Sequence, residues 1–155
     1  MLIIQPSQAK GNKMLHPDFP VVVGTYKMTN EWSVTLPGKF NRRIENNDLV
    51  IWRPGMTLWI AIWGNDKGET KESRLNRIMN DMSPKALEVK TTTSSSILRL
   101  SYRLKEEEEQ GAVAAFYCFA IGKTGQVEMA IYLDNESDVK NAQAILESLI
   151  EVNAL

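Results

Sequence analysis

The chain has 155 residues, of which 43% are hydrophobic and 24% charged, and its formal net charge is -1. This composition is that of an ordinary globular protein, and the length suits one domain with a sizeable core. Nucleic-acid-binding proteins usually carry a basic excess. That excess is missing here, so the sequence argues against a nucleic acid as partner.

The chain holds a single cysteine, Cys118, so no intramolecular disulfide can form. This fits a reducing compartment. No run of about 18 apolar residues occurs, and we therefore expect no membrane span. The first residues lack the positive start and the longer apolar stretch of a secretory signal. We expect a cytoplasmic protein.

The folded part of the chain follows a polar lead-in. Residues 1–20 form this proline-bearing lead-in, and residues 21–155 predict a single domain. Strands are indicated by runs of β-branched and aromatic residues or by apolar–polar alternation. The first ones are expected at residues 21–26, 32–36 and 40–45, with Pro37-Gly38 ending the second and Asn46-Asn47 forming a tight turn after the third.

The most informative segment is a pair of strands near the middle of the chain, residues 49–52 and 58–63. The Arg-Pro-Gly-Met sequence between them marks a reverse turn, so the two strands should form an antiparallel hairpin. Counting back from the turn fixes the expected register. The predicted pairs are Trp52 with Thr57, Ile51 with Leu58, and Val50 with Trp59.

Both faces of this hairpin are apolar. One face is aliphatic and should belong to the core, whereas the other carries three of the four tryptophans. A strand that is apolar on both sides must be covered on both sides. The tryptophan face therefore needs a cover: a helix, a second subunit or a ligand. The aliphatic face contains Leu49, Ile51, Leu58, Ile60 and Ile62, and the tryptophan face contains Val50, Trp52, Trp59 and Trp63.

The second half of the chain predicts two helices and further strands. Apolar residues recur at helical spacing from 75 to 82, between an acidic start at 66–69 and Ser83-Pro84. A second helix is expected after Asp134-Asn135. The further strands are expected at residues 87–91, 97–104, 112–121 and 127–133. This order predicts an α+β fold, with a mainly antiparallel sheet of about seven strands flanked by two main helices.

Few residues offer catalytic or metal-binding chemistry. His16 is the only histidine and Cys118 the only cysteine, so neither a histidine-dependent triad nor a zinc site is indicated. Alternation places Cys118 inside a strand, where a free cysteine is usually a packing residue. We expect no cofactor and no enzymatic activity. A magnesium or calcium site built from carboxylates alone stays open.

Three arginines are expected near the tryptophan hairpin. Paired arginines can grip a carboxylate or a phosphate, or they can form surface ion pairs with Glu45 or Asp48. Trp and Arg are also the residue types that are enriched in binding hot spots. Tryptophans that no helix covers would form an apolar patch typical of an interface. The predicted partner-binding residues are Trp52, Trp59, Trp63, Arg42, Arg43 and Arg53.

The domain opens with Trp32-Ser33-Val34-Thr35-Leu36-Pro37 and closes with a strand, tight turn, strand and helix between Ala112 and Leu149. This order of elements resembles the Mog1/PsbP-like fold group, over residues 21–152 in topology. Members of that group have an antiparallel sheet with helices on both sides, and they bind other proteins. The resemblance therefore implies protein binding rather than catalysis.

Two functions remain as expectations. The first is a non-enzymatic protein-interaction module, with an adaptor, chaperone-like or inhibitor-type role, whose partner is another protein or a second copy in a homodimer. The alternative is a small-molecule-binding protein or an enzyme that uses carboxylate and arginine side chains in a cleft.

Overall fold

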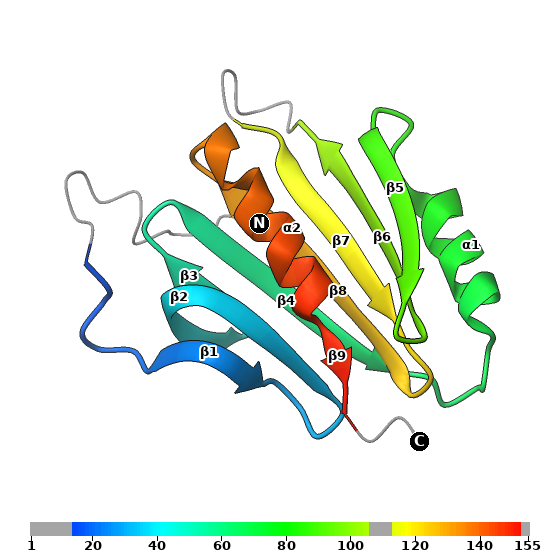
Figure 1. The fold of residues 1–155 in the computed structure, drawn as a ribbon, viewed down its shortest axis with the longest axis horizontal. Coiled ribbons are helices and arrows are strands. Elements are labelled where there is room, and N and C mark those ends of the chain that lie inside the picture. Colours follow the sequence, from blue (N-terminus) through cyan, green and yellow to red (C-terminus); the bar gives the residue numbers. More distant parts are fainter. Residues whose placement is uncertain (1–13, 106–112, 153–155) are drawn as a thin grey trace.

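The computed structural model describes residues 14–105 and 113–152, which form one antiparallel sheet with a helix on each face (Figure 1). The predicted α+β class is confirmed, but the sheet of this part of the chain has nine strands, so the expected count of about seven is too low. The strands are β1 (Val21–Lys27), β2 (Trp32–Glu45), β3 (Asp48–Arg53), β4 (Met56–Gly64), β5 (Leu87–Ser94), β6 (Ile97–Leu104), β7 (Ala115–Ile121), β8 (Gly125–Leu133) and β9 (Ile150–Glu151).

The sheet consists of two four-stranded meanders, and each meander is followed by a helix. Strands β1 to β4 precede α1 (Lys71–Asp81), and strands β5 to β8 precede a short 3-10 turn, η2 (Glu136–Asp138), and α2 (Val139–Ser148). The meanders join where β4 pairs with β8, which gives the order β1-β2-β3-β4-β8-β7-β6-β5. The short β9 pairs with the start of β2. Figure 1 shows α2 crossing one face of the sheet and α1 near the β5 edge.

The β3–β4 hairpin has the register that the sequence predicts. Trp52 lies opposite Thr57, Ile51 opposite Leu58, and Val50 opposite Trp59. The aliphatic face enters the main core, which is closed by the apolar side of α2. Asn46 and Asn47 adopt the expected positive φ angles, 51° and 70°, in the turn before the hairpin.

Strand β2 corrects the prediction that Pro37-Gly38 ends a strand. The β1–β2 register steps from Val23 opposite Lys39 to Gly24 opposite Leu36. Pro37 and Gly38 therefore form a bulge inside one long strand, where the missing amide hydrogen of proline costs no ladder hydrogen bond. Gly24, across from the bulge, has a φ of 67°, which glycine adopts without steric cost.

The end of the lead-in is fastened to the sheet by a buried side chain. Asn41 accepts a hydrogen bond from the amide of His16 at 2.7 Å and donates to the carbonyls of His16 and Phe19 at 3.0 and 3.1 Å. The ring of Phe19 then meets that of Trp52 edge to face, at 5.1 Å between centroids. Residues 14–20 thereby cover one end of the tryptophan face.

Both helices begin later than the sequence suggests. Thr70 caps α1, because its Oγ1 accepts a hydrogen bond from the amide of Ser73 at 3.0 Å. The acidic residues at 66–69 belong to the preceding loop. Asn135 caps η2 without a side-chain hydrogen bond, and α2 follows only at Val139. Neither helix is long and apolar enough to cross a bilayer, and the described residues hold no other candidate.

Candidate functional site

The tryptophan face continues from β4 across β8 to β7. Trp59 lies opposite Ala130, which lies opposite Tyr117. In the next row Glu128 stands between Ala61 and Phe119. Most of these side chains are only half-buried, in contrast to the fully covered face under α2. We call this surface the open aromatic face, and it consists of Trp59, Ala61, Trp63, Tyr117, Phe119, Glu128, Ala130 and Tyr132.

The three predicted tryptophans share one face but differ in burial. Trp52 is 1% exposed, whereas Trp63 is 58% exposed. Trp59 is half-buried, and its Nε1 donates a hydrogen bond to Asp48 Oδ2 at 2.7 Å. The cover of Trp52 includes Phe19 of the chain's own lead-in, which is not among the helix, second subunit or ligand that the sequence suggested.

The predicted arginines do not form one cluster. Arg43 lies on the tryptophan face, with its guanidinium carbon 4.6 Å from the Trp52 ring centroid and its Nε 3.3 Å from Glu45 Oε1. Arg53 lies on the opposite side of the sheet. Its guanidinium carbon is 5.4 Å from the Phe40 ring centroid, and its Nη2 is 3.3 Å from Asp138 Oδ1. Arg42 is opposite Ile51 in the register, so it also belongs to the α2 side.

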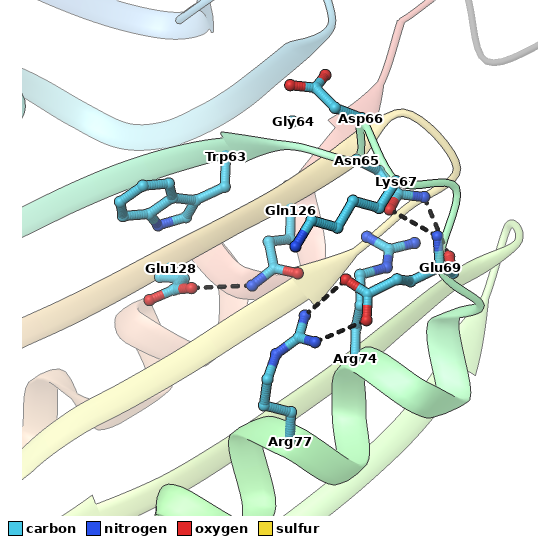
Figure 2. A pocket seen from close by; sticks show the side chains of 10 residues that line it. All are labelled: Trp63, Gly64, Asn65, Asp66, Lys67, Glu69, Arg74, Arg77, Gln126 and Glu128. Atoms are coloured by element: carbon cyan, nitrogen blue, oxygen red, sulfur yellow. Dashed lines mark hydrogen bonds and ion pairs between the residues drawn. The ribbon is translucent and has the colours of Figure 1, made fainter.

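A hollow of about 550 Å³ lies where the open aromatic face meets α1. Figure 2 shows α1 and the side chains of Trp63, Gln126 and Glu128 on the same side of the sheet. Within the hollow, the Gln126 side-chain amide donates to a carboxylate oxygen of Glu128 at 2.8 Å. The lining residues are Trp63, Gly64, Asn65, Asp66, Lys67, Glu69, Arg74, Arg77, Gln126 and Glu128.

A buried arginine fixes the inner end of the hollow. Arg74 on α1 is 2% exposed and donates to the carbonyls of Gly122 and Gly125 in the β7–β8 turn. Burial lowers the pKa of Arg74, and the charge of Glu151 opposes this shift. Glu151 holds the same turn by accepting from the amides of Lys123 and Thr124, at 2.9 and 2.7 Å.

Both glycines of this turn are closely surrounded, and Gly125 is required for lack of space. A Cβ at Gly122 would lie 2.6 Å from the carboxylate of Glu151, and one at Gly125 would lie 2.1 Å from the carbonyl oxygen of Trp63. Real Cβ contacts are not this short. At Gly125 the clash is with backbone, so a larger residue would displace β4, whereas at Gly122 the flexible carboxylate of Glu151 would have to move. The close approach of Gly125 helps to keep Trp63 at the mouth of the hollow.

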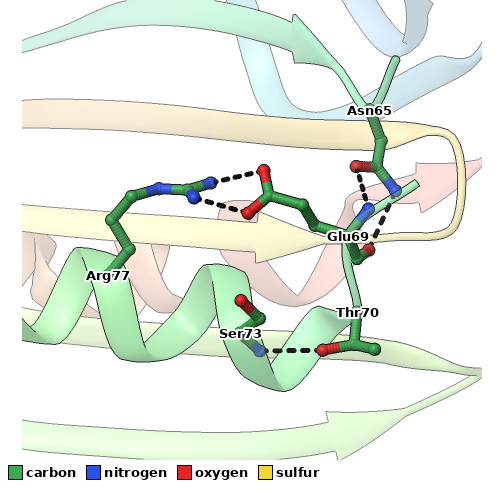
Figure 3. Close-up of polar contacts among 5 residues, drawn as sticks. All are labelled: Asn65, Glu69, Thr70, Ser73 and Arg77. Carbon is green, nitrogen blue, oxygen red and sulfur yellow. Dashed lines mark hydrogen bonds and ion pairs between the residues drawn. The ribbon is translucent and has the colours of Figure 1, made fainter. Parts of the chain in front are cut away.

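The outer rim is also held by hydrogen bonds (Figure 3). Asn65 binds both backbone groups of Glu69, each at 3.0 Å. Arg77 donates to both carboxylate oxygens of Glu69, at 2.7 and 3.2 Å. This bond lowers the pKa of Glu69 and raises that of Arg77. The two charges neutralise each other and leave little for a ligand.

Catalytic groups are sparse elsewhere in the described residues. Cys118 is buried in the main core, as predicted, and desolvation strongly raises the pKa of its thiol. His16 accepts a hydrogen bond from the amide of Asp18 at its Nδ1, at 3.1 Å. In the same part of the chain, no three His, Cys, Asp or Glu side chains gather in a group that could hold a metal ion.

No family model matches the chain, and no curated protein matches it at a significant level.

The sequence did not single out several residues of this site. The sequence marks residues 112–121 as apolar on both faces, and this signal could have identified Tyr117 and Phe119. Glu128 gave no such signal, because its position depends on the pairing of β4 with β8, which are far apart in the chain.

Proposed function

We propose that this protein is a non-enzymatic interaction module that binds another protein, or a second copy of itself, through the open aromatic face. The observation that carries the proposal is the 58% exposure of Trp63 beside several half-buried rings. Exposing a large indole to water is unfavourable, and contiguous apolar patches on a folded protein mark interaction sites. Tryptophan and tyrosine supply much of the binding energy at such sites.

Neighbouring side chains hold several rings of this face in place, so the rings need not become ordered when a partner binds. Tyr102 stacks on Tyr117 and Phe119, with centroid distances of 5.4 and 6.3 Å. Trp59 is oriented by its hydrogen bond to Asp48. Rings that are already fixed lose little conformational entropy on association, which favours affinity.

The sequence resemblance to the Mog1/PsbP-like fold group supports the same function, because the members of that group bind other proteins. An adaptor, a chaperone-like protein and an inhibitor would each use such a face. A reducing, cytoplasmic location belongs to the same proposal and rests on the single buried cysteine, Cys118.

Site-specific crosslinking tests the proposal. A photo-crosslinking phenylalanine derivative placed at Trp63 should capture a protein in cells, or give a covalent dimer of the chain. The same group at Lys140, an exposed position on α2, serves as the matched control. Trp59→Ala in the Trp63 probe should reduce the product while its circular dichroism spectrum shows that the fold is kept. Equal products at both positions would contradict the proposal.

The hollow favours a second candidate, a small-molecule-binding protein or an enzyme. Its volume of about 550 Å³ is within the range of ligand sites, and carboxylate and arginine side chains line it. A melting-shift screen against organic acids, phosphates and nucleotides tests this candidate. A saturable shift that Trp63→Ser abolishes would favour it over the interaction module.

A further inference from the structure

We propose that the open aromatic face accepts a lysine or arginine side chain of its partner, with Trp63 contacting the cation and Glu128 pairing with it. The inference rests on the proposed function and names the chemistry of the partner. It predicts a basic contact segment on that partner.

The position of Glu128 carries the argument. Its neighbours across the sheet are Ala61 on β4 and Phe119 on β7. Trp59 and Trp63 flank Ala61 on the same face, at the diagonal positions, which aromatic side chains can reach. The small side chain of Ala61 leaves room above it, so the carboxylate stands among rings and faces the hollow that Trp63 also lines (Figure 2).

Glu128 has no cationic partner in residues 14–105 and 113–152. Its one hydrogen bond there comes from the neutral amide of Gln126, at 2.8 Å. The charge of this carboxylate also acts on a neighbouring ring. The pKa of Tyr102 is raised mainly by burial and, to a smaller extent, by the negative charge of Glu128. A half-buried carboxylate gains from a cation that forms a charge-assisted hydrogen bond. The face of an exposed indole attracts the same cation.

The arginines that line the hollow do not oppose the binding of a cation at Glu128. Arg77 is paired with Glu69, and Arg74 is bound to two carbonyls inside the fold, so neither guanidinium is available to an anion. Lys67 is the exception, since it lines the hollow and forms no ion pair with a described residue. Its ammonium should repel a basic partner and attract an acidic one. Removing that charge therefore distinguishes the two partner classes.

Two capped peptide probes, Gly-Arg-Gly-Arg-Gly and Gly-Glu-Gly-Glu-Gly, test the inference on the full chain by NMR. The chain has four indole N–H groups. Those of Trp59 and Trp63 should shift on titration with the arginine peptide, whereas those of Trp32 and Trp52, each 1% exposed, should not. The glutamate peptide should leave all four unchanged. Shifts with the glutamate peptide instead would overturn the inference.

Charge variants give the sign. Glu128→Gln keeps the shape and an acceptor for Gln126, and it should weaken binding of the arginine peptide roughly tenfold, as expected for a lost charge-assisted hydrogen bond. Lys67→Met should strengthen that binding. Glu147→Gln, an exposed carboxylate on α2, should change nothing. Unchanged affinity in Glu128→Gln, or weaker binding in Lys67→Met, would refute the inference.

Failure of the inference is distinguishable from failure of the proposed function. If the crosslink at Trp63 persists but Glu128→Gln neither reduces it nor weakens the arginine peptide, the face binds a partner without selecting a cation. If the crosslink at Trp63 does not exceed that at Lys140, the interaction function itself fails. Melting temperatures of all variants confirm that each change acts on binding and not on folding.

Discussion

Two buried arginines on β6 hold the C-terminal helix against the sheet. Arg99 donates to the carbonyls of Leu146 and Leu149, at 3.2 and 2.7 Å, at the end of α2. Arg103 binds Glu136, which precedes α2, at 2.7 and 3.0 Å. A cation is favoured at a helix C-terminus, where carbonyl groups lack partners in the helix. The two arginines thus hold opposite ends of the helical segment to β6.

Arg99→Met should strongly destabilise the fold. The variant keeps much of the apolar stem but leaves buried carbonyls of α2 without their donor, a loss of about 2–4 kcal/mol in the free energy of unfolding. Urea denaturation measures it. Lys39→Met, at an exposed position on β2, should stay within about 0.5 kcal/mol of wild type. Equal stability of the two variants would show that Arg99 does not cap α2.

The Arg103–Glu136 pair predicts a pH dependence. The hydrogen bond from Arg103 holds the pKa of Glu136 below its usual range. The folded state therefore binds this proton less tightly than the unfolded chain does. The stability it adds is present above the unfolded pKa and is lost as the pH falls through the folded pKa. Because the Glu136 side chain is 67% exposed, solvent screening limits the contribution to about 1 kcal/mol.

Glu136→Gln should consequently be less stable than wild type near neutral pH, and the difference should vanish as the pH falls through the lowered pKa of folded Glu136, where the two side chains become alike in charge. Urea denaturation at a series of pH values measures the difference. Glu31→Gln, at an exposed carboxylate between β1 and β2 that forms no ion pair with a described residue, is the control. A difference that stays constant across the series would exclude the ion pair as its cause.

At the scale of elements, structure that depends on neighbouring residues was predicted correctly, whereas contacts between distant segments were not. The β3–β4 hairpin was predicted in its register because its turn and its alternation lie within a few residues. The strand at residues 97–104 was predicted as well, but nothing local showed that Arg99 and Arg103 are buried. The face that carries them is covered by α2, a contact between residues that are distant in the chain.

The candidate site shows the same limit. The sequence places Trp52, Trp59 and Trp63 on one face, and the register confirms this. Which part of that face stays open depends on how the lead-in folds back onto Trp52 and on where α1 lies. Neither leaves a periodic pattern in the sequence. Glu128 enters the site only through the pairing of β4 with β8.

Helix α1 is anchored to the sheet mainly by one side chain, which gives a matched pair of variants. Arg74→Met removes two buried hydrogen bonds to the β7–β8 turn and should cost about 2–3 kcal/mol. Arg77→Met, one turn further along the same helix, breaks a surface ion pair whose arginine side chain is 54% exposed, so its effect on stability should be much smaller because solvent screens the pair. Urea denaturation compares them. Equal losses would contradict the anchoring role of Arg74.

At the scale of the whole molecule, the sheet is open, and β5 forms one of its edges. Every residue of β5 is exposed, which makes this strand a template for pairing with another chain. Lys90 carries a charge at this edge, and the register is irregular between Leu87 and Lys90, where Glu88 has a φ of 52°. Charges and irregularities of this kind protect an edge strand from association.

Lys90→Val tests this protection. The change leaves a neutral, β-branched stretch along β5 and should produce concentration-dependent self-association, because the unpaired backbone groups can then meet a second β5. Light scattering measures it. Lys140→Val, which removes the same charge from the exposed side of α2, should not associate in this way. Edge pairing should also persist when Trp63→Ser is added, whereas binding through the open aromatic face should not. Association that Trp63→Ser abolishes would place the contact on that face instead.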